Sequence, residues 1–251
     1  MEKKQENTLE RYGLIGRNIS YSFSAGYFKE KFSKLKLTNF SYQNFDLSTI
    51  EELKDVLGNF PDLKGFNVTI PYKEEIIPLL DHMSNEALEI GAVNTVKIEH
   101  GKLIGYNTDC FGFEHSLKSF LKPHHSNALV LGTGGASKAI AYVLDKLQIN
   151  YSFVSRNPEK EGFTYNDLNF NLIQNHTVII NCTPLGTFPK TNEKPDIPYE
   201  GLTDTHLLYD LIYNPAETRF LALGREAGAT VSNGLSMLEL QAEKAWEIWR
   251  G

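Results

Sequence analysis

The chain has 251 residues, 41% of them hydrophobic and 22% charged, which is the composition of an ordinary globular protein. The net charge is −6 and no run of lysine or arginine stands out, so nothing in the composition indicates nucleic-acid binding. An anionic small molecule stays possible as a ligand, because a pocket can be locally positive in an acidic protein. The length fits two modest domains or one large one.

The cysteines and the first residues bear on the compartment. Cys110 and Cys182 lie in dissimilar contexts without the spacing of metal ligands, which favours reduced thiols and a cytoplasmic location. Residues 1–10 are polar, unlike a signal or transit peptide, and no apolar run approaches the roughly 20 residues of a membrane helix. The histidines show no metal-ligand spacing either. We expect a soluble cytoplasmic protein that needs no metal.

Strands and helices are expected to alternate along the whole chain, which predicts an α/β fold. In the first half the apolar periodicity predicts strands at 12–15, 40–45 and 66–70, helices at 25–35 and 85–90, and a hairpin over 96–106. Ser48 and Glu51 have the spacing of a capping box, which predicts a helix that ends before Gly58.

The second half is more regular and predicts βαβ units on a parallel sheet. Short apolar strands are expected at 128–131, 151–155, 177–182, 207–211 and 230–231, and a final helix at 236–249. Linker composition at 123–127 favours a domain boundary within 107–126. Residues 159–176 are short for a full unit, which leaves open whether a helix is trimmed or absent there.

Residues 65–74 read Gly-Phe-Asn-Val-Thr-Ile-Pro-Tyr-Lys-Glu and are typical of a strand with one polar face. Because side chains alternate in an extended chain, Asn67, Thr69 and Lys73 are predicted to share that face. Pro71 has no N–H, so the strand is expected to end here or to lie at a sheet edge. An amide, a hydroxyl and an ammonium suit a small hydroxylated or carboxylated ligand. The alternative is an edge strand with a solvated polar face.

A glycine-rich turn, Gly132-Thr133-Gly134-Gly135-Ala136, follows an apolar strand and opens an amphipathic helix. In that context the turn predicts dinucleotide binding, because Gly134 lets the backbone approach a pyrophosphate and the helix N-terminus offers free N–H groups. Ser137 stands where the strict fingerprint has Gly or Ala. The alternative is a plain strand–helix turn that needs glycine for its backbone alone.

The end of the next strand, Val154-Ser155-Arg156-Asn157, carries no carboxylate to hold a free ribose 2′-hydroxyl. Arg156 is instead suited to a 2′-phosphate and to stacking on adenine, which favours NADP over NAD. The alternative is an ordinary solvated arginine.

Asp109, in Asn107-Thr108-Asp109, ends the hairpin and precedes a helix. Reduction of a carbonyl by hydride creates an alkoxide that needs a proton, which Lys73 is able to supply and a partner carboxylate to orient. Asp109 is therefore a candidate partner, although a helix N-cap is its more common role.

Other polar residues have equally good structural explanations. Ser22 and Ser24 suit a helix cap, and Asn94 suits a turn. Residues 181–184 either line a cofactor cleft or merely close a strand, and Gln241 on the last helix is expected to face solvent by default.

Taken in order, seven segments resemble the shikimate dehydrogenase family over nearly the whole chain after residue 10. They are Ser22-Phe23-Ser24, Asn67 to Lys73, Gly91-Ala92-Val93-Asn94-Thr95, Asn107-Thr108-Asp109, Gly132 to Ala136, Tyr209 to Pro215, and Gly234 to Gln241. The resemblance implies a substrate-binding and catalytic domain at 11–109, completed by the helix 234–251, and a Rossmann-type NADP-binding domain at 110–233.

The resemblance also implies an activity and a site. The reaction would be the reversible reduction of 3-dehydroshikimate to shikimate with NADPH, in aromatic amino-acid biosynthesis, by a monomer or homodimer. Lys73 and Asp109 would be the catalytic pair. The substrate would be bound by Ser22, Ser24, Asn67, Thr69, Asn94, Tyr213 and Gln241. The cofactor would be bound by Gly132, Thr133, Gly134, Gly135, Ala136, Ser155, Arg156, Asn157, Thr183, Ile212 and Gly234.

Three features depart from the family pattern. Tyr21 and Ala25 flank the paired serines where His and Pro are common, Ser236 replaces the second glycine of Gly-Leu-Gly-Met, and Ser155-Arg156-Asn157 replaces Asn-Arg-Thr. These departures bear on cofactor affinity more than on the type of reaction. Two alternatives stay open. A quinate/shikimate dehydrogenase that uses NAD is disfavoured by the missing carboxylate after the second Rossmann strand and by the presence of both serines, and a non-catalytic nucleotide-sensing protein is disfavoured by Lys73 and Asp109.

Overall fold

The computed structural model describes residues 9–20, 22–157 and 162–251, and the chain divides into two compact units. Unit 1 holds the chain up to Thr108 together with Lys244–Gly251, and unit 2 is Asp109–Glu243. The last helix, α9 (Leu235–Arg250), therefore contributes residues to both units, whereas the sequence placed all of 234–251 in the first domain. Each unit is described by itself.

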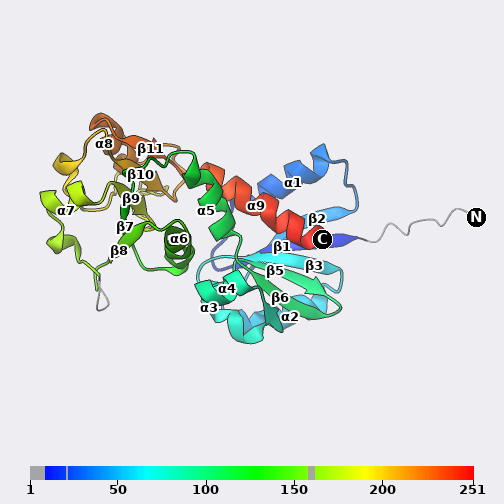
Figure 1. Ribbon diagram of the computed structural model, residues 1–251. Helices are drawn as coiled ribbons and strands as arrows, with labels where there is room; N and C mark the ends of the chain where they lie inside the picture. Colours follow the sequence, from blue (N-terminus) through cyan, green and yellow to red (C-terminus); the bar gives the residue numbers. More distant parts are fainter. Residues whose placement is uncertain (1–8, 21, 158–161) are drawn as a thin grey trace, which may run out of the picture. The chain divides into compact units, whose positions relative to one another are not determined.

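Unit 1 is built on a six-stranded mixed sheet with the order β2-β1-β3-β5-β6-β4 (Figure 1). β1 runs parallel to both β2 and β3, and the hairpin β5–β6 is antiparallel, as is the β3–β5 pair. The strands are β1 (Glu10–Gly16), β2 (Phe40–Asp46), β3 (Leu63–Val68), β4 (His82–Met83), β5 (Thr95–Glu99) and β6 (Lys102–Tyr106). The helices are α1 (Phe23–Lys34), η1 (Ile50–Glu52), α2 (Leu53–Asn59), α3 (Tyr72–Glu75), η2 (Ile77–Leu79) and α4 (Asn85–Ile90).

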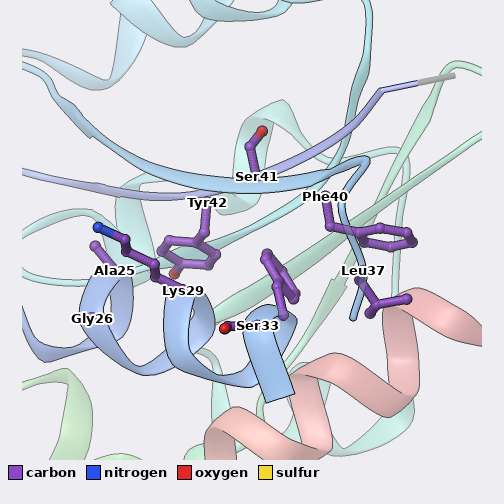
Figure 2. A pocket seen from close by; sticks show the side chains of 9 residues that line it. Ala25, Gly26, Lys29, Ser33, Leu37, Phe40, Ser41 and Tyr42 are labelled. Carbon is purple, nitrogen blue, oxygen red and sulfur yellow. The ribbon is translucent and has the colours of Figure 1, made fainter. Parts of the chain in front are cut away.

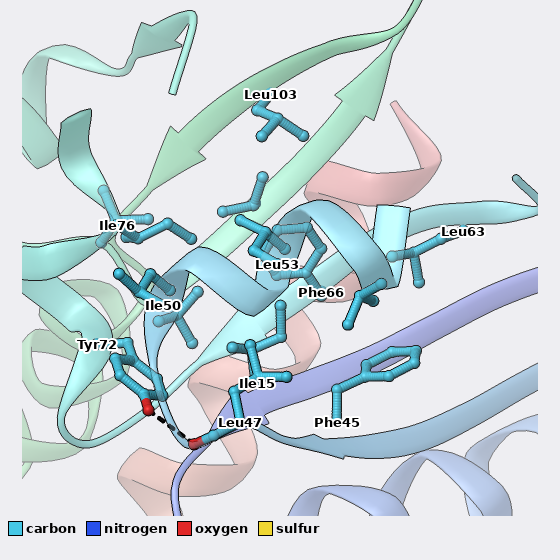
Figure 3. Close-up of a cluster of buried hydrophobic side chains, with 14 of the residues drawn as sticks. Ile15, Phe45, Leu47, Ile50, Leu53, Leu63, Phe66, Tyr72, Ile76 and Leu103 are labelled. Atoms are coloured by element: carbon cyan, nitrogen blue, oxygen red, sulfur yellow. Dashed lines mark hydrogen bonds between the residues drawn. The ribbon is translucent and has the colours of Figure 1, made fainter. Parts of the chain in front are cut away.

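One face of this sheet packs on a cluster of buried apolar side chains (Figure 3). Ile15, Phe45 and Phe66 come from three neighbouring strands, and Leu53 of α2 and Ile76 beyond α3 pack against them. The large apolar area removed from water stabilises this side of unit 1 and fixes the positions of α2 and α3.

The opposite face of the sheet is aromatic. Tyr12 of β1 stacks on Trp249 of α9, with ring centroids 4.8 Å apart, and Phe28 of α1 lies 5.4 Å from the same indole. The Trp249 indole N–H donates to the carbonyl of Val96 over 3.0 Å. Gly65 is required here, since a side chain at that position would collide with the indole. These contacts bind the end of α9 to unit 1.

The segment 65–74 differs from the sequence prediction in two respects. β3 ends at Val68, two residues early, and it lies between β1 and β5, so the edge-strand alternative is wrong. Lys73 lies in the short helix α3 and not in the strand, so the prediction that Asn67, Thr69 and Lys73 share one strand face is wrong. Pro71 precedes α3, where its missing N–H costs no ladder hydrogen bond.

The predicted capping box is also wrong. Thr49 rather than Ser48 is the N-cap residue of η1, and the following helix α2 runs past Gly58 to Asn59.

Unit 2 contains a five-stranded parallel sheet with the order β11-β10-β9-β7-β8 (Figure 1). The strands are β7 (Asn127–Leu131), β8 (Asn150–Val154), β9 (Val178–Asn181), β10 (Leu207–Asp210) and β11 (Thr230–Ser232). The helices are α5 (Asp109–Lys118), α6 (Gly135–Lys146), η3 (Tyr165–Asp167), α7 (Phe170–Asn175), η4 (Tyr199–Gly201), α8 (Arg219–Glu226) and the first part of α9. The predicted α/β fold with βαβ units is confirmed.

The strand order matches a Rossmann sheet that lacks its third strand, because β8 lies at the edge where the full order 3-2-1-4-5-6 has a further neighbour. An isolated bridge from Val154 to Phe163 occupies that edge. The connection to β9 then contains η3 and the six-residue helix α7, so a short helix is present. Residues 158–161 lie outside the described part of the chain. Across the described ranges, no helix is both long and apolar enough to cross a membrane.

Candidate functional site

Lys73 lies in α3 of unit 1, directly after a turn whose backbone is hydrogen-bonded to neighbouring elements. The Thr69 N–H donates to the carbonyl of Ile15 over 2.9 Å, and the Lys73 carbonyl accepts from the N–H of Val93 over 2.8 Å. The fully buried Tyr72 donates its hydroxyl to the Leu47 carbonyl over 2.7 Å (Figure 3). The backbone on both sides of Lys73 is therefore fixed to neighbouring elements, while its partly buried side chain extends from a short helix.

Asn67 is buried at 5% exposure and is already bonded within the protein. Its Nδ2 donates to Thr95 Oγ1 over 3.0 Å and to the Asn94 carbonyl over 3.3 Å, and its Oδ1 accepts from the Tyr42 hydroxyl over 2.9 Å. Both amide hydrogens are thereby used, so Asn67 has only a lone pair of Oδ1 left for a ligand.

Asn94 continues this network toward the end of unit 1. Its Nδ2 donates to Thr108 Oγ1 over 3.0 Å, and its Oδ1 accepts from the Thr108 N–H over 2.7 Å. Thr95 Oγ1 also donates to Asn94 Oδ1, over 3.2 Å. Asn94 thus fixes the backbone immediately before Asp109, a task beyond that of a turn residue.

The paired serines lie at the start of α1. Ser22 is the N-cap residue, and its side chain accepts from the Ser24 N–H over 3.2 Å, so the capping explanation is confirmed for Ser22. Ser24 hydrogen-bonds the hydroxyl of Tyr42. Ligand binding by either serine stays a prediction.

Asp109 is the first residue of α5 in unit 2 and is buried at 7% exposure. A carboxylate in the first turn interacts favourably with the helix dipole. Because α5 begins at Asp109, the N-cap position is one residue earlier, at Thr108, and the N-cap role suggested for Asp109 is wrong.

The glycine-rich turn of unit 2 follows β7 directly. Gly132 adopts a φ of +102°, which residues with a side chain rarely adopt, and its N–H donates to the Val154 carbonyl over 2.8 Å. Gly134 is the N-cap residue of α6, and a Cβ there would meet no atom within 4 Å. Ser137 turns inward, since its hydroxyl donates to the Gly134 carbonyl over 2.6 Å. The serine that departs from the fingerprint is therefore buried and hydrogen-bonded within the turn.

A buried carboxylate joins the loops after β9 and β10. Asp210 accepts from Asn181 Nδ2 and from the Ile212 N–H, each over 3.0 Å, and from Thr218 Oγ1 over 2.6 Å. Asn181 Oδ1 in turn accepts from the N–H and the hydroxyl of Thr183, over 3.0 and 2.6 Å. Burial dominates these hydrogen bonds and raises the pKa of Asp210 to about 6.

The end of β8 carries Ser155, Arg156 and Asn157. Arg156 and Asn157 are exposed, while the Ser155 hydroxyl is buried and has no hydrogen-bond partner among the residues that the structure describes. An unpaired hydroxyl beside an exposed guanidinium fits an incoming anionic group. Together with the open side of Gly134, these residues fit a phosphorylated dinucleotide.

Three further candidates lie within α9 or before it. Gly234 donates its N–H to the Ile212 carbonyl over 3.0 Å, and a side chain there would collide with the Leu211 backbone. Tyr213 is half-buried. Gln241 is buried at 9% exposure, so the expectation of a solvent-facing side chain is wrong.

Sequence reasoning missed the residues that hold the candidates in place: Tyr42, Thr95, Thr108, Asn181, Asp210 and Thr218. Tyr42, Thr95, Asn181 and Asp210 are strand residues by pattern, and Thr218 is the N-cap of α8. What the pattern does not show is which side chains they meet: Tyr42 and Asn67 are 25 residues apart, and Asn181 and Asp210 are 29 residues apart. Within the described ranges, no group of three or more His, Cys, Asp or Glu side chains is arranged to hold a metal ion.

Comparison with known proteins gives one consistent result. Residues 14–96 match the family model described as the shikimate dehydrogenase substrate binding domain. The NADP(+) shikimate dehydrogenase of Methanococcus aeolicus is 40% identical over 95% of this chain and 91% of its own length.

Solved structures are similar over both units. The shikimate 5-dehydrogenase of Thermus thermophilus, in complex with NADP(H) and shikimate, has a TM-score of 0.85 at 31% identity and covers 96% of this chain and 93% of its own. The ligand-free 5-ketofructose reductase of a Gluconobacter strain has a TM-score of 0.84 at 30% identity, over 96% and 92%.

Proposed function

The chain belongs to the shikimate dehydrogenase family, and from that premise we propose that it catalyses the reversible, NADP-dependent reduction of 3-dehydroshikimate to shikimate. The observation that carries the proposal is 40% identity to an NADP(+) shikimate dehydrogenase over 95% of the chain. The activity belongs to aromatic amino-acid biosynthesis.

The residues that support the use of NADP all lie in unit 2. Gly132 and Gly134 shape a turn whose open side adjoins the N-terminus of α6, which suits a pyrophosphate. Arg156, exposed at the end of β8, would pair with the 2′-phosphate, and the unpaired hydroxyl of Ser155 would donate to it. Thr183 and Ile212 would line the same edge from the loops that Asp210 joins, and Gly234 would do so from the turn after β11.

The bound dinucleotide supplies or accepts the hydride, and the protein must supply or accept the proton. In the direction of reduction the Lys73 ammonium would give its proton to the oxygen of the former carbonyl. In the direction of oxidation the neutral amine would take the hydroxyl proton. Asp109, a carboxylate at the start of α5, would be the partner that orients the ammonium.

The substrate would be held by hydroxyl, amide and phenol groups. Ser22, Ser24, Thr69 and Asn94 would bind its carboxylate and hydroxyls from unit 1, with Asn67 limited to accepting one hydrogen bond. Tyr213 and Gln241 would take part as well. The proposal extends to a monomer or homodimer with a cytoplasmic location, which a sequence with only two cysteines in dissimilar contexts favours.

The experiment is a comparison of initial rates of coenzyme reduction with four pairs: shikimate or quinate, each with NADP⁺ or NAD⁺. The proposal predicts the highest kcat/KM for shikimate with NADP⁺. A higher value with NAD⁺ or with quinate would instead favour the quinate/shikimate dehydrogenase alternative. An absence of turnover with all four pairs would favour a nucleotide-sensing protein.

A further inference from the structure

We infer that Tyr42, a residue outside every motif of the sequence, is a positioning residue for substrate binding that holds Ser24 and Asn67 on one hydroxyl oxygen. The inference deepens the proposed function and rests on it, because Ser24 and Asn67 are proposed to contact shikimate.

The position of Tyr42 follows from the register of the sheet. In the parallel pairs Tyr42 lies opposite Tyr12, and Leu14 lies opposite both Asn44 of β2 and Asn67 of β3. Residues paired in register share a face, and so do residues two apart on one strand, such as Tyr42 and Asn44. Tyr42 and Asn67 therefore project from the same side of the sheet, although β1 separates their strands. The Tyr42 side chain is long enough to cross β1 and reach the amide.

The ring of Tyr42 is firmly held. It stacks on Phe28 of α1 with centroids 4.6 Å apart and an angle of 13° between the planes, and Trp249 lies 6.4 Å away. Figure 2 shows the ring on the α1 side of β2, with Ser41 projecting to the opposite side. Removal of the hydroxyl would therefore leave the ring in place.

The hydroxyl connects two elements that each carry a proposed substrate ligand. Tyr42 donates its only hydroxyl hydrogen to Asn67 Oδ1, so the hydrogen bond with Ser24 has to be donated by the serine. Burial of the phenol raises the pKa of Tyr42 far above its usual range, so it stays protonated and keeps donating to Asn67. The start of α1 and the end of β3 are tied together at this oxygen.

The same bond sets the orientation of the amide of Asn67. With Oδ1 directed at Tyr42, Nδ2 is directed at Thr95 Oγ1, whose own hydrogen is donated to Asn94 Oδ1. Loss of the Tyr42 hydroxyl leaves Oδ1 without its donor and permits the amide to rotate, which would disturb Asn94 as well. The effect should fall on substrate affinity more than on the chemical step.

Tyr12 offers a matched control for this position. It lies opposite Tyr42 in register, on the same face, and its ring stacks on Trp249, which also lies 6.4 Å from the ring of Tyr42. Its hydroxyl donates to Glu10 Oε2 over 3.0 Å, away from the proposed ligands. Tyr12→Phe and Tyr42→Phe therefore make the same chemical change in the same aromatic layer.

The test measures kcat and both KM values for the wild type, Tyr42→Phe and Tyr12→Phe, with shikimate and NADP⁺ varied separately. Tyr42→Phe is expected to raise KM for shikimate about tenfold, equivalent to about 1.4 kcal/mol, with kcat within about threefold and KM for NADP⁺ unchanged. Tyr12→Phe should keep wild-type constants.

Two results overturn the inference and are distinguishable. An active wild type whose KM for shikimate is the same in Tyr42→Phe and Tyr12→Phe overturns the role of Tyr42 alone. A wild type that does not oxidise shikimate overturns the proposed function, and with it any role of Tyr42 in binding shikimate.

Discussion

Asn181 donates its side-chain amide to the carboxylate of Asp210 over 3.0 Å, and this bond joins the ends of β9 and β10. Both residues are fully buried. Thr183 and Ile212, two proposed cofactor ligands, hydrogen-bond the same pair. The two loops at this edge of the unit 2 sheet are therefore held by one buried polar network. Its carboxylate, Asp210, has a pKa raised to about 6 by burial.

Asp210 makes stability depend on pH in a predictable direction. Burial raises its pKa to about 6, above the value of about 3.9 in an unfolded chain, so the folded protein binds the proton more tightly. The unfolding free energy should therefore rise by about 2 kcal/mol from this group as the pH falls from 7 to 4. The nearby Cys182 and Tyr199 have raised pKa values and stay neutral throughout.

Denaturant unfolding at a series of pH values checks this, with Asp210→Asn as the variant that cannot titrate. The wild type should gain about 2 kcal/mol relative to Asp210→Asn across that window. Asp204→Asn, at an exposed carboxylate in the same unit, should follow the wild type. Parallel curves for the wild type and Asp210→Asn would show that Asp210 keeps an ordinary pKa.

Lys73→Ala should lower kcat by roughly 10²- to 10⁴-fold, because the developing alkoxide loses its proton donor. Folding should be kept, since the backbone of Lys73 makes the described bonds and its side chain is only partly buried. Lys64→Ala, at an exposed position of β3, is the control and should retain full activity. Near-normal turnover in Lys73→Ala would show that the proton comes from another group.

Gly134→Ala separates cofactor binding from folding. The backbone of Gly134 is extended and a Cβ meets no protein atom, so the variant should fold with wild-type stability. The same methyl group would occupy the space proposed for the pyrophosphate, so KM for NADP⁺ should rise at least about tenfold. Gly58→Ala, another site with free space but in helix α2, is the control and should leave KM for NADP⁺ unchanged. An unchanged KM for NADP⁺ in Gly134→Ala would place the pyrophosphate elsewhere.

Arg156→Ala should reduce the preference for NADP⁺ over NAD⁺ by about 10- to 100-fold, because a charged hydrogen bond to the 2′-phosphate is worth about 1.5–3 kcal/mol. KM for NAD⁺ should change little. Arg219→Ala removes an exposed guanidinium of the same unit and serves as the control. If the ratio of the two kcat/KM values stays the same, the 2′-phosphate is bound without Arg156.

Much of this fold was predictable because its signals are local. The hairpin around His100-Gly101 and the parallel strands of unit 2 follow from alternation, apolar runs and turn residues, and the structure confirms them. The end of β3 was not predictable in the same way. By pattern, Thr69 and Tyr72 continue the strand. In the structure the Thr69 N–H donates to Ile15 of β1 and the Tyr72 N–H donates to the Thr69 carbonyl, so the chain turns and Lys73 lies in helix α3.

The positions of the proposed ligands were predictable only through the family motifs, and the residues that support them were not. Tyr42 and Asn67 are 25 residues apart and meet only because β1 pairs with both of their strands. Asp210 looks like a loop residue after an apolar strand, yet it is fully buried among three donors. Such partners depend on register, which a single sequence does not reveal.

If this chain reduces a cyclic hydroxylated keto acid with NADPH, a comparison of its rates with two carbonyl substrates, each given separately, tests that activity most directly. Purified protein is given NADPH with 3-dehydroshikimate or with 5-ketofructose, the latter because a reductase of that sugar has a similar fold. We predict that kcat/KM for 3-dehydroshikimate is at least about 100-fold higher, as expected for a site whose polar groups match the substrate. Equal values, or a preference for 5-ketofructose, would contradict the account.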